Sequence, residues 1–411
     1  MRVLSSIAER VNEELAAILH DARTQTPELA GLIDELARVI GAGGKRLRPS
    51  LCVLGYQAVT NQSHLDFRGS AASGARDALP RGAATPPNPP SFFRGFAASG
   101  ARGSVRKGAA TPPNPPPIFA AAASLELLHT FALLHDDVMD ESMTRRGVTS
   151  TLAAKGAPIA ILAGDLAFVL SDRVFAESGF SPKAIGRARR HLDRMRVDAI
   201  AGQYLQMTLA GDRSLDQKSA SKIASLKTGS YTVEGPLAVG AALGDASAEN
   251  QSVLAAFAAP LGEAFQLMDD LKGLERGAGG VAAANRYNSG APEAANPPNQ
   301  PGVVAEDDIR TGAPTYLVAT GLVLASANQR ALILAAWGVE KANEEQVEAA
   351  RKALIACGAA ELTVERAAAL VEQSRIVLES SQARRLNSGA LIVLNEVAAS
   401  IMEGRVQFAR F

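Results

Sequence analysis

Apolar residues recur at helical spacing through most of the chain, and this pattern constrains the fold more than any other feature. They recur every three or four positions in two runs, Val3 to Leu19 and Leu29 to Ile40, which predicts a pair of helices with one apolar face each. The same spacing recurs in 118–140, 157–178, 183–210, 215–229, 231–243, 248–272, 303–325, 328–337, 343–356, 362–380 and 388–402. We therefore expect an all-α fold, a single domain over 1–411 with a central apolar cavity.

Composition agrees with this fold and excludes several classes of function. Apolar residues make up 47% of the 411 positions and aromatic residues only 5%, which favours helix-on-helix packing. The 42 basic and 42 acidic side chains cancel, so no overall charge attracts nucleic acid or an anionic membrane. No stretch has the length of an unbroken apolar membrane span, and the N-terminus is unlike a signal peptide. Two cysteines cannot form a disulfide framework, so we expect a cytoplasmic protein.

Two segments interrupt the helical pattern. Residues 66–118 hold a tandem repeat with a 26-residue period and ten of the chain's 21 prolines. A Pro/Gly/Ala/Ser-rich segment of this kind cannot bury a core, so we expect a disordered insertion. Residues 277–302 are similar in composition and predict a second low-complexity insertion.

The strongest chemical signal is the acidic motif Asp136-Asp137-x-x-Asp140 at the end of a long apolar helix. Asp136 and Asp140 share a helix face, and like charges at this spacing repel. Magnesium binds carboxylates together with substrate phosphates, so the motif suits a metal-bridged diphosphate. Taken alone, it also fits a solvated acidic helix end.

Two basic clusters and a second acidic pair accompany this motif. Arg145-Arg146 follows it directly, and Gly43-Gly44-Lys45-Arg46-Leu47-Arg48 lies upstream at a helix start. Guanidinium groups bind phosphate oxygens, although a solvated basic turn has the same composition. Asp269-Asp270 ends another apolar stretch, so two acidic helix ends can hold several metal ions between them.

Taken together, these motifs resemble the trans-type polyprenyl synthetases, the family of farnesyl, geranylgeranyl and longer prenyl diphosphate synthases. The matching segments are GGKRLRP, ELLHTFALLHDDVMD with RRG, Gly202-Gln203, Lys227-Thr228-Gly229 and FQLMDD, in the family's order. The resemblance implies the isoprenoid synthase fold, a homodimer, and head-to-tail condensation of isopentenyl diphosphate with an allylic diphosphate.

The resemblance also implies roles for individual residues. Magnesium and the allylic diphosphate are assigned to Asp136, Asp137, Asp140, Asp269 and Asp270. Isopentenyl diphosphate is assigned to Lys45, Arg48, His129 and Arg146, although a histidine on an apolar helix is more often a core residue. The allylic diphosphate is further assigned to Arg145, Lys227, Thr228 and Gln266. Phe131, five positions before Asp136, resembles the aromatic floor of short-chain enzymes and predicts a C20 product, with C15 next.

The chain departs from the family after its second acidic pair. Lys272-Gly273 stands where a third aspartate is common, and Ala313 replaces a family lysine. Charge-assisted contacts typically contribute about 1.5–3 kcal/mol, so an impaired paralogue that serves as a partner subunit is the leading alternative. A terpene cyclase shares the first motif, but it does not explain the GGKRLRP cluster. A binding module built on the Pro-rich repeats has only those repeats in its favour.

Overall fold

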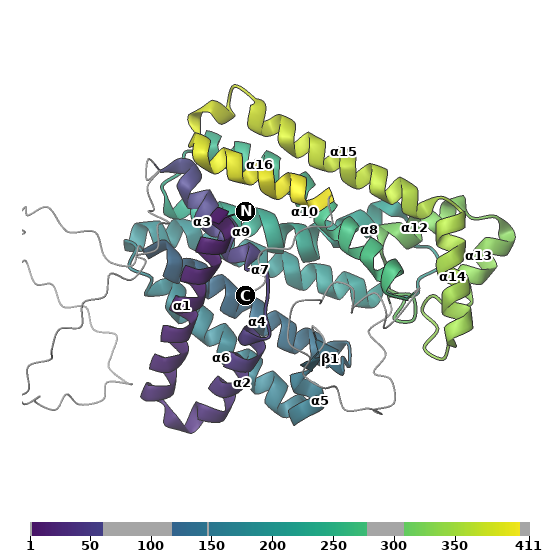
Figure 1. The fold of residues 1–411 in the computed structure, drawn as a ribbon, viewed down its shortest axis with the longest axis horizontal. Coiled ribbons are helices and arrows are strands. Elements are labelled where there is room, and N and C mark those ends of the chain that lie inside the picture. Colours follow the sequence, from purple (N-terminus) through teal and green to yellow (C-terminus); the bar gives the residue numbers. More distant parts are fainter. Residues whose placement is uncertain (1, 61–116, 146–147, 278–307, 403–411) are drawn as a thin grey trace, which may run out of the picture.

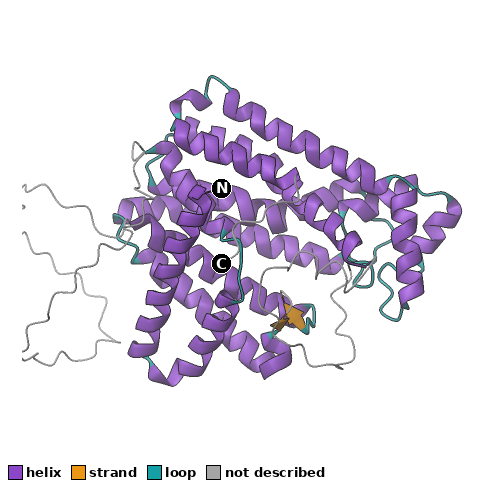
Figure 2. Cartoon of the chain, viewed as in Figure 1, coloured by secondary structure: helices purple, strands orange, loops and turns teal. Residues whose placement is uncertain are grey.

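Helices form nearly all of the chain that the structure describes, as the apolar spacing predicts (Figures 1 and 2). The structure is a computed structural model, and it describes residues 2–60, 117–145, 148–277 and 308–402, apart from the side chains of 275–277. Within these ranges the only sheet is a two-stranded antiparallel hairpin. The predicted insertions at 66–118 and 277–302 lie almost entirely outside the described residues.

The elements follow one another in this order: α1 (Arg2–Gln25), η1 (Pro27–Leu29), α2 (Ala30–Gly41), α3 (Leu47–Val59), α4 (Pro117–Met139), β1 (Thr144–Arg145), β2 (Val148–Thr149), α5 (Thr151–Lys155), α6 (Ala157–Ala176), α7 (Pro182–Thr208), α8 (Gln217–Ile223), η2 (Ala224–Glu234), α9 (Gly235–Leu243), α10 (Ala248–Gly277), α12 (Tyr316–Leu324), α13 (Ala327–Leu334), α14 (Glu344–Ala356), α15 (Ala359–Glu379), η3 (Ala383–Arg385) and α16 (Ser388–Met402).

Helix α4 lies at the centre of the first of three apolar clusters. This cluster joins α4 to α1, α2, α3, α6, α7 and α9, and α4 packs extensively against α6. Of the described helices, α4 alone is long and apolar enough to cross a membrane. Two-thirds of its apolar stretch is buried inside the protein, as expected for a core helix. Because α4 is packed on several sides, the position of the acidic residues at its C-terminal end is fixed.

The second and third clusters organise the C-terminal half. α10 packs along α15 and η2, and α16 runs beside α15 over the same core (Figure 1). Helices α12, α13 and α14 form the third cluster around the buried Trp337 at the far end of α15. These contacts hold α10, which carries the second acidic pair, against η2.

Helices α3 and α9 approach each other closely because glycines line their contact. A Cβ atom at Gly55 would lie 2.1 Å from the carbonyl oxygen of Leu237. A Cβ atom at Gly240 would lie 1.8 Å from the carbonyl oxygen of Cys52. Side chains at either position would push the helices apart, and α3 carries the basic segment of the site.

Three helix predictions were wrong in their boundaries. The helix expected at 303–325 begins only at Tyr316, because Thr315 caps it and Pro314 precedes the cap. The break expected after 229 is absent, since η2 is a π-helix that runs without interruption from α8 into α9. Helix α10 continues to Gly277, so Asp269 and Asp270 lie about two turns before its end.

Candidate active site

The first acidic motif occupies the last turn of α4. Asp136 is partly buried, and the backbone N–H of Asp140 donates to the Asp136 carbonyl at 2.8 Å. The C-terminal end of a helix carries partial negative charge, so carboxylates here are unfavourable unless cations approach them. The motif therefore calls for positive partners, and the structure provides one.

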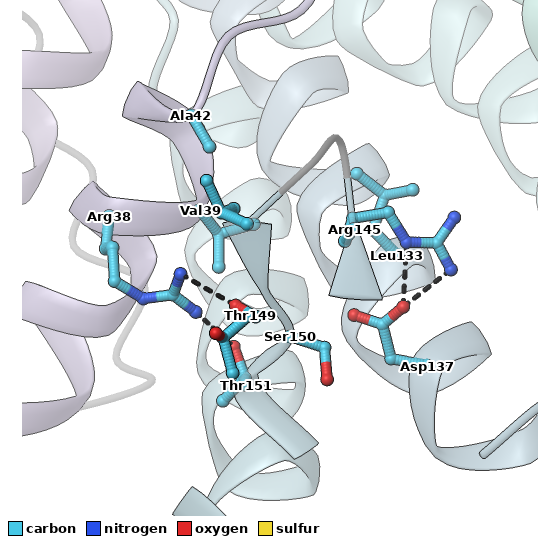
Figure 3. Close-up of a pocket in the computed structure, with 10 residues that line it drawn as sticks. Arg38, Val39, Ala42, Leu133, Asp137, Arg145, Thr149, Ser150 and Thr151 are labelled. Carbon is cyan, nitrogen blue, oxygen red and sulfur yellow. Dashed lines mark hydrogen bonds and ion pairs between the residues drawn. The ribbon is translucent and has the colours of Figure 1, made fainter. Parts of the chain in front are cut away.

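That partner is Arg145, on the hairpin that follows α4 (Figure 3). Its Nε atom donates to Asp137 Oδ1 at 2.7 Å, and its Nη2 atom lies 2.6 Å from the same oxygen. Asp137 is buried and only 3% exposed. The ion pair thus holds a predicted diphosphate-binding arginine beside the predicted metal-binding residues.

The basic segment before α3 divides into residues with different surroundings. Arg46 is buried in a structural network, where it bonds Glu126 at 2.7 Å and Asn12 at 2.8 Å. Arg48 has different partners, both on η2: its Nη2 donates to Thr232 Oγ1 at 2.6 Å, and its guanidinium lies 4.5 Å from the Tyr231 ring centroid. Lys45 is exposed at the start of the helix.

The pKa of Arg48 reflects both its burial and the acidic residues around it. Burial lowers the pKa of the Arg48 guanidinium, while the negative charges of Glu126 and Asp136 act in the opposite direction. Asp136 is therefore close enough to Arg48 to influence its ionisation. This brings the first acidic motif and the predicted isopentenyl diphosphate site together.

The π-helix η2 connects the two predicted diphosphate sites. At its start, Lys227 Nζ donates to Gln206 at 3.1 Å, and Thr228 donates to Gln266. Gln266 in turn donates to Asp270 at 2.6 Å, so η2 is linked to the second acidic pair. π-Helices are rare and are frequent at functional sites.

The other end of η2 contacts the first site through two residues that the sequence analysis missed. Tyr231 donates from its hydroxyl to the Leu128 carbonyl at 3.2 Å, and its ring centroid lies 6.2 Å from that of His129. Thr232 accepts the hydrogen bond from Arg48. No spacing in the sequence indicated these two residues, because their position depends on the π-helical register.

The second acidic pair is unevenly exposed. Asp269 is exposed and lies 4.0 Å from Lys272 Nζ, whereas Asp270 is only 7% exposed. Burial, and then the negative charge of Asp308, raises the pKa of Asp270 well above its ordinary value. Positive charge near Asp270 would offset this increase and favour the ionised carboxylate.

Asp308 was also missed as a member of this site. A Cβ atom at Gly273 would lie 2.8 Å from Asp308 Oδ2. The Asp308 carboxylate therefore occupies space that a side chain at position 273, the third position of the motif, would otherwise fill. Ala313 follows, with its backbone N–H bonded to the Asp308 carbonyl at 2.8 Å.

Phe131 lies one to two turns below Asp136, between two rings. Its ring centroid is 5.0 Å from that of Phe168 on α6 and 4.6 Å from that of His135. Arg196 covers the Phe168 ring at 4.9 Å. The predicted floor residue is thus part of an aromatic contact between α4 and α6. Arg146, which was predicted to bind isopentenyl diphosphate, lies outside the described residues.

The carboxylates suit a magnesium ion that binds together with the substrate, rather than one enclosed by protein ligands alone. Among the described residues, no group of three or more acidic, histidine or cysteine side chains is arranged to hold a metal alone. Magnesium is commonly held by one or two carboxylates, with phosphates and waters completing its coordination. Separate acidic pairs on α4 and α10 suit that mode.

Comparisons with known proteins agree with the fold and the motifs. The family model described as polyprenyl synthetase matches residues 104–278. The geranylgeranyl pyrophosphate synthase of Geoglobus acetivorans is 26% identical over 380 residues, which cover 92% of each chain. The geranylgeranyl diphosphate synthase of Sulfolobus acidocaldarius is 28% identical over 229 residues, covering 55% of this chain and 63% of that enzyme.

A solved structure matches almost the whole chain. The geranylgeranyl pyrophosphate synthase of Corynebacterium glutamicum, in complex with isoprenyl diphosphate and magnesium, has a TM-score of 0.73 and 26% identity, covering 98% of this chain and 99% of that one. Fold, motifs and relatives define an all-helical enzyme of the prenyltransferase class. In fold, motifs and sequence the chain is similar to the polyprenyl synthetases.

Proposed function

We propose that the protein condenses isopentenyl diphosphate head-to-tail with an allylic diphosphate to give a short-chain prenyl diphosphate. The observation that carries the proposal is the position of η2. This one element contacts the second acidic pair through Thr228 and Gln266, and it contacts Arg48 through Thr232. Residues suited to two separate diphosphates therefore adjoin the same segment of backbone.

The allylic diphosphate is assigned to the side of the site between α4 and α10. Arg145 and Lys227 would neutralise its oxygens, and Thr228 and Gln266 would orient it. Asp136, Asp140, Asp269 and Asp270 would hold magnesium, and Asp137 is engaged by Arg145. Its assignment as a metal ligand stays a prediction. Bound magnesium supplies charge neutralisation of the departing diphosphate.

Ionisation breaks the allylic C–O bond, and both electrons leave with the diphosphate. Cationic side chains placed where that negative charge develops lower the barrier most. The double bond of isopentenyl diphosphate, held by Lys45, Arg48 and His129, then attacks the allylic cation. Loss of a proton to the released pyrophosphate restores the double bond. Apolar side chains of α4 and α6 exclude water, which would otherwise quench the cation.

Product length is assigned to Phe131. An aromatic side chain braced by Phe168 blocks the space below Asp136, so we propose a C20 product, with C15 next. The fold itself does not set this length, because a decaprenyl diphosphate synthase of Rhodobacter capsulatus has a similar fold with a TM-score of 0.67.

The test is product analysis with the purified full chain. The protein is incubated with magnesium, labelled isopentenyl diphosphate and, separately, C5, C10 and C15 allylic diphosphates. We expect magnesium-dependent C20 or C15 product, and the same preparation with the metal chelated should be inactive. Asp136→Asn serves as the matched inactive control for contaminating synthase.

The alternative of an impaired partner subunit rests on Gly273 and Ala313, which lack the carboxylate and the cation usual in the family. Absence of turnover by well-folded protein with all three primers would favour it over the main proposal. Restoration of activity by a second synthase subunit would then establish it.

We further infer a homodimer. Val197, Ile200 and Tyr204 are each more than 60% exposed along one face of α7, and an exposed apolar stripe of this kind marks a surface for association. Light scattering should give a mass of twice 42.7 kDa. Substitution of Ile200 with Glu should then yield a monomer. We also propose a cytoplasmic location.

A further inference from the structure

The hairpin that carries Arg145 is fastened at two places. On the α4 side, Ser150 donates from its hydroxyl to the Ser142 carbonyl at 2.6 Å, and the Ser150 N–H donates to the Met143 carbonyl at 3.0 Å. These bonds close the hairpin upon itself. They do not determine how the hairpin as a whole lies against the rest of the protein.

The second fastening comes from α2. Arg38 donates from Nη1 to the Thr149 carbonyl at 3.2 Å and from Nη2 to Thr151 Oγ1 at 3.1 Å. Thr151 donates from the same hydroxyl to Glu35 Oε1 at 2.6 Å. Figure 3 shows Arg38 reaching the hairpin from one side, while the Arg145–Asp137 pair lies on the other side of the same pocket.

The group at the centre of this network is a buried carboxylate. Glu35 is 3% exposed and Thr151 is 1% exposed. Burial raises the pKa of Glu35, but the hydrogen bonds from Arg38 and Thr151 outweigh it, and the pKa lies below its ordinary value. A buried charge is tolerated only when it is paired and hydrogen-bonded, and such a network holds its members in one arrangement.

None of these three residues belongs to the motifs that define the site, yet their network includes the Thr149 carbonyl at the end of β2, the strand that pairs with β1 and Arg145. We propose that Glu35, Arg38 and Thr151 are positioning residues: together they fix the β1–β2 hairpin against α2 and so hold the Arg145 guanidinium in place for the allylic diphosphate. The proposal rests on the proposed function for the identity of that ligand. Its chemistry, an anionic diphosphate, is what Arg145 recognises.

A purely structural role would affect the whole fold and both substrates equally, whereas a positioning role affects the allylic side alone. Thr151→Val removes the hydroxyl at nearly constant volume, and Thr151→Ser keeps it. Arg38→Met removes the bonds to Thr149 and Thr151 together with the ion pair to Glu35, at a partly exposed position. Asp34→Asn is the matched control, because Asp34 is adjacent on α2 but pairs with Arg23 on α1.

The first measurement is calorimetric binding of inorganic pyrophosphate with magnesium. We expect Thr151→Val and Arg38→Met to weaken binding about three- to tenfold, the range expected for one net hydrogen bond. Thr151→Ser and Asp34→Asn should stay within about twofold of the wild type. Equal pyrophosphate affinity in wild type and Thr151→Val, with both folded, would overturn the proposal.

The second measurement is steady-state kinetics. The KM for the allylic diphosphate should rise in Thr151→Val, while the KM for isopentenyl diphosphate and the melting temperature remain near those of the wild type. A uniform rise of both KM values, accompanied by a lower melting temperature, would assign these residues to stability only. A wild type that binds pyrophosphate but turns over no primer would instead contradict the proposed function, so the two failures are distinguishable.

Discussion

The Arg145 guanidinium contacts a single oxygen of Asp137 through two nitrogens, Nε at 2.7 Å and Nη2 at 2.6 Å. The negative charge of Asp136, the preceding residue, favours the charged form of Arg48 and so acts to raise the Arg48 pKa. Two adjacent aspartates of one motif therefore have different partners. Asp137 pairs with an arginine, and we propose that Asp136 binds the metal and the diphosphate.

This difference predicts different kinetic effects for the two aspartates. Asp136→Asn should lower kcat about 100- to 1000-fold, the typical loss when one group that stabilises developing charge is removed. Asp137→Asn should mainly raise the KM for the allylic diphosphate, because Arg145 loses its anchor. Steady-state kinetics with each substrate varied in turn provides the measurement. Identical profiles for the two variants would contradict this division of roles.

Arg46 and Arg48 are two residues apart, and their substitution should separate stability from binding. Arg46→Met leaves Glu126 buried without its partner and should cost about 3–5 kcal/mol of unfolding free energy. Arg48→Met should leave stability nearly unchanged and raise the KM for isopentenyl diphosphate at least tenfold. Urea denaturation and kinetics on both variants test this. A stable Arg46→Met enzyme would show that the buried pair is dispensable.

Replacing Phe131 with Ala should lengthen the product. Removal of the ring opens the space that Phe131 now shares with Phe168, and the growing chain can enter it. Chromatography of the dephosphorylated products measures the shift, which we expect to be at least one C5 unit. Phe180→Ala is the matched control, since Phe180 packs on Tyr56 instead. An unchanged product would refute the floor assignment.

The raised pKa of Asp270 predicts a gain in stability when its charge is removed. A carboxyl whose pKa is higher in the folded than in the unfolded chain contributes most at low pH, and this contribution is lost as the pH rises through the folded pKa. At neutral pH without magnesium, Asp270→Asn should therefore melt roughly 2–4 °C above the wild type, a shift worth about 1 kcal/mol in a large domain.

Two controls sharpen the Asp270 experiment. The difference in melting temperature should shrink as the pH is lowered, because the wild-type carboxyl then becomes protonated. Magnesium with pyrophosphate should stabilise the wild type more than Asp270→Asn. A variant less stable than wild type at neutral pH would show that the carboxylate is already neutralised by its surroundings.

Restoring a cation at Ala313 should speed the reaction. The backbone of Ala313 is fixed, since its carbonyl accepts from Trp337 Nε1 at 3.1 Å, and its side chain is partly exposed. Ala313→Lys should raise kcat/KM for the allylic diphosphate about tenfold, in line with one charge-assisted contact. Ala313→Gln, of similar length without charge, should not. Equal effects of Lys and Gln would remove charge as the explanation.

Much of the fold could be predicted because apolar spacing reports which face of a helix is buried. It correctly indicated α1, α2, α4, α6 and α7. The same spacing cannot report the hydrogen-bond register, so η2 was expected as two helices broken near Gly229. Apolar spacing also does not show where a helix begins. Thr315 caps α12, so the helix predicted at 303–325 begins too early.

The candidate site was also predictable only in part. Residues in motifs, such as Asp136 and Lys227, were named from the sequence. Residues that contribute through tertiary contacts, such as Tyr231, Asp308 and Thr151, belong to no motif, because their partners are far away in the chain. The Asp137–Arg145 pair lies between these cases: both residues were named, but their contact depends on the hairpin that turns the chain back toward α4.

The π-helical segment η2 has a consequence for how distances are kept during the reaction. Thr228 and Thr232 lie within one turn of this wide helix, and each bonds a different part of the site. A shift of η2 would therefore change both contacts together. If the two diphosphates bind as proposed, the distance between them would depend on this single segment of backbone rather than on the separation of two helices.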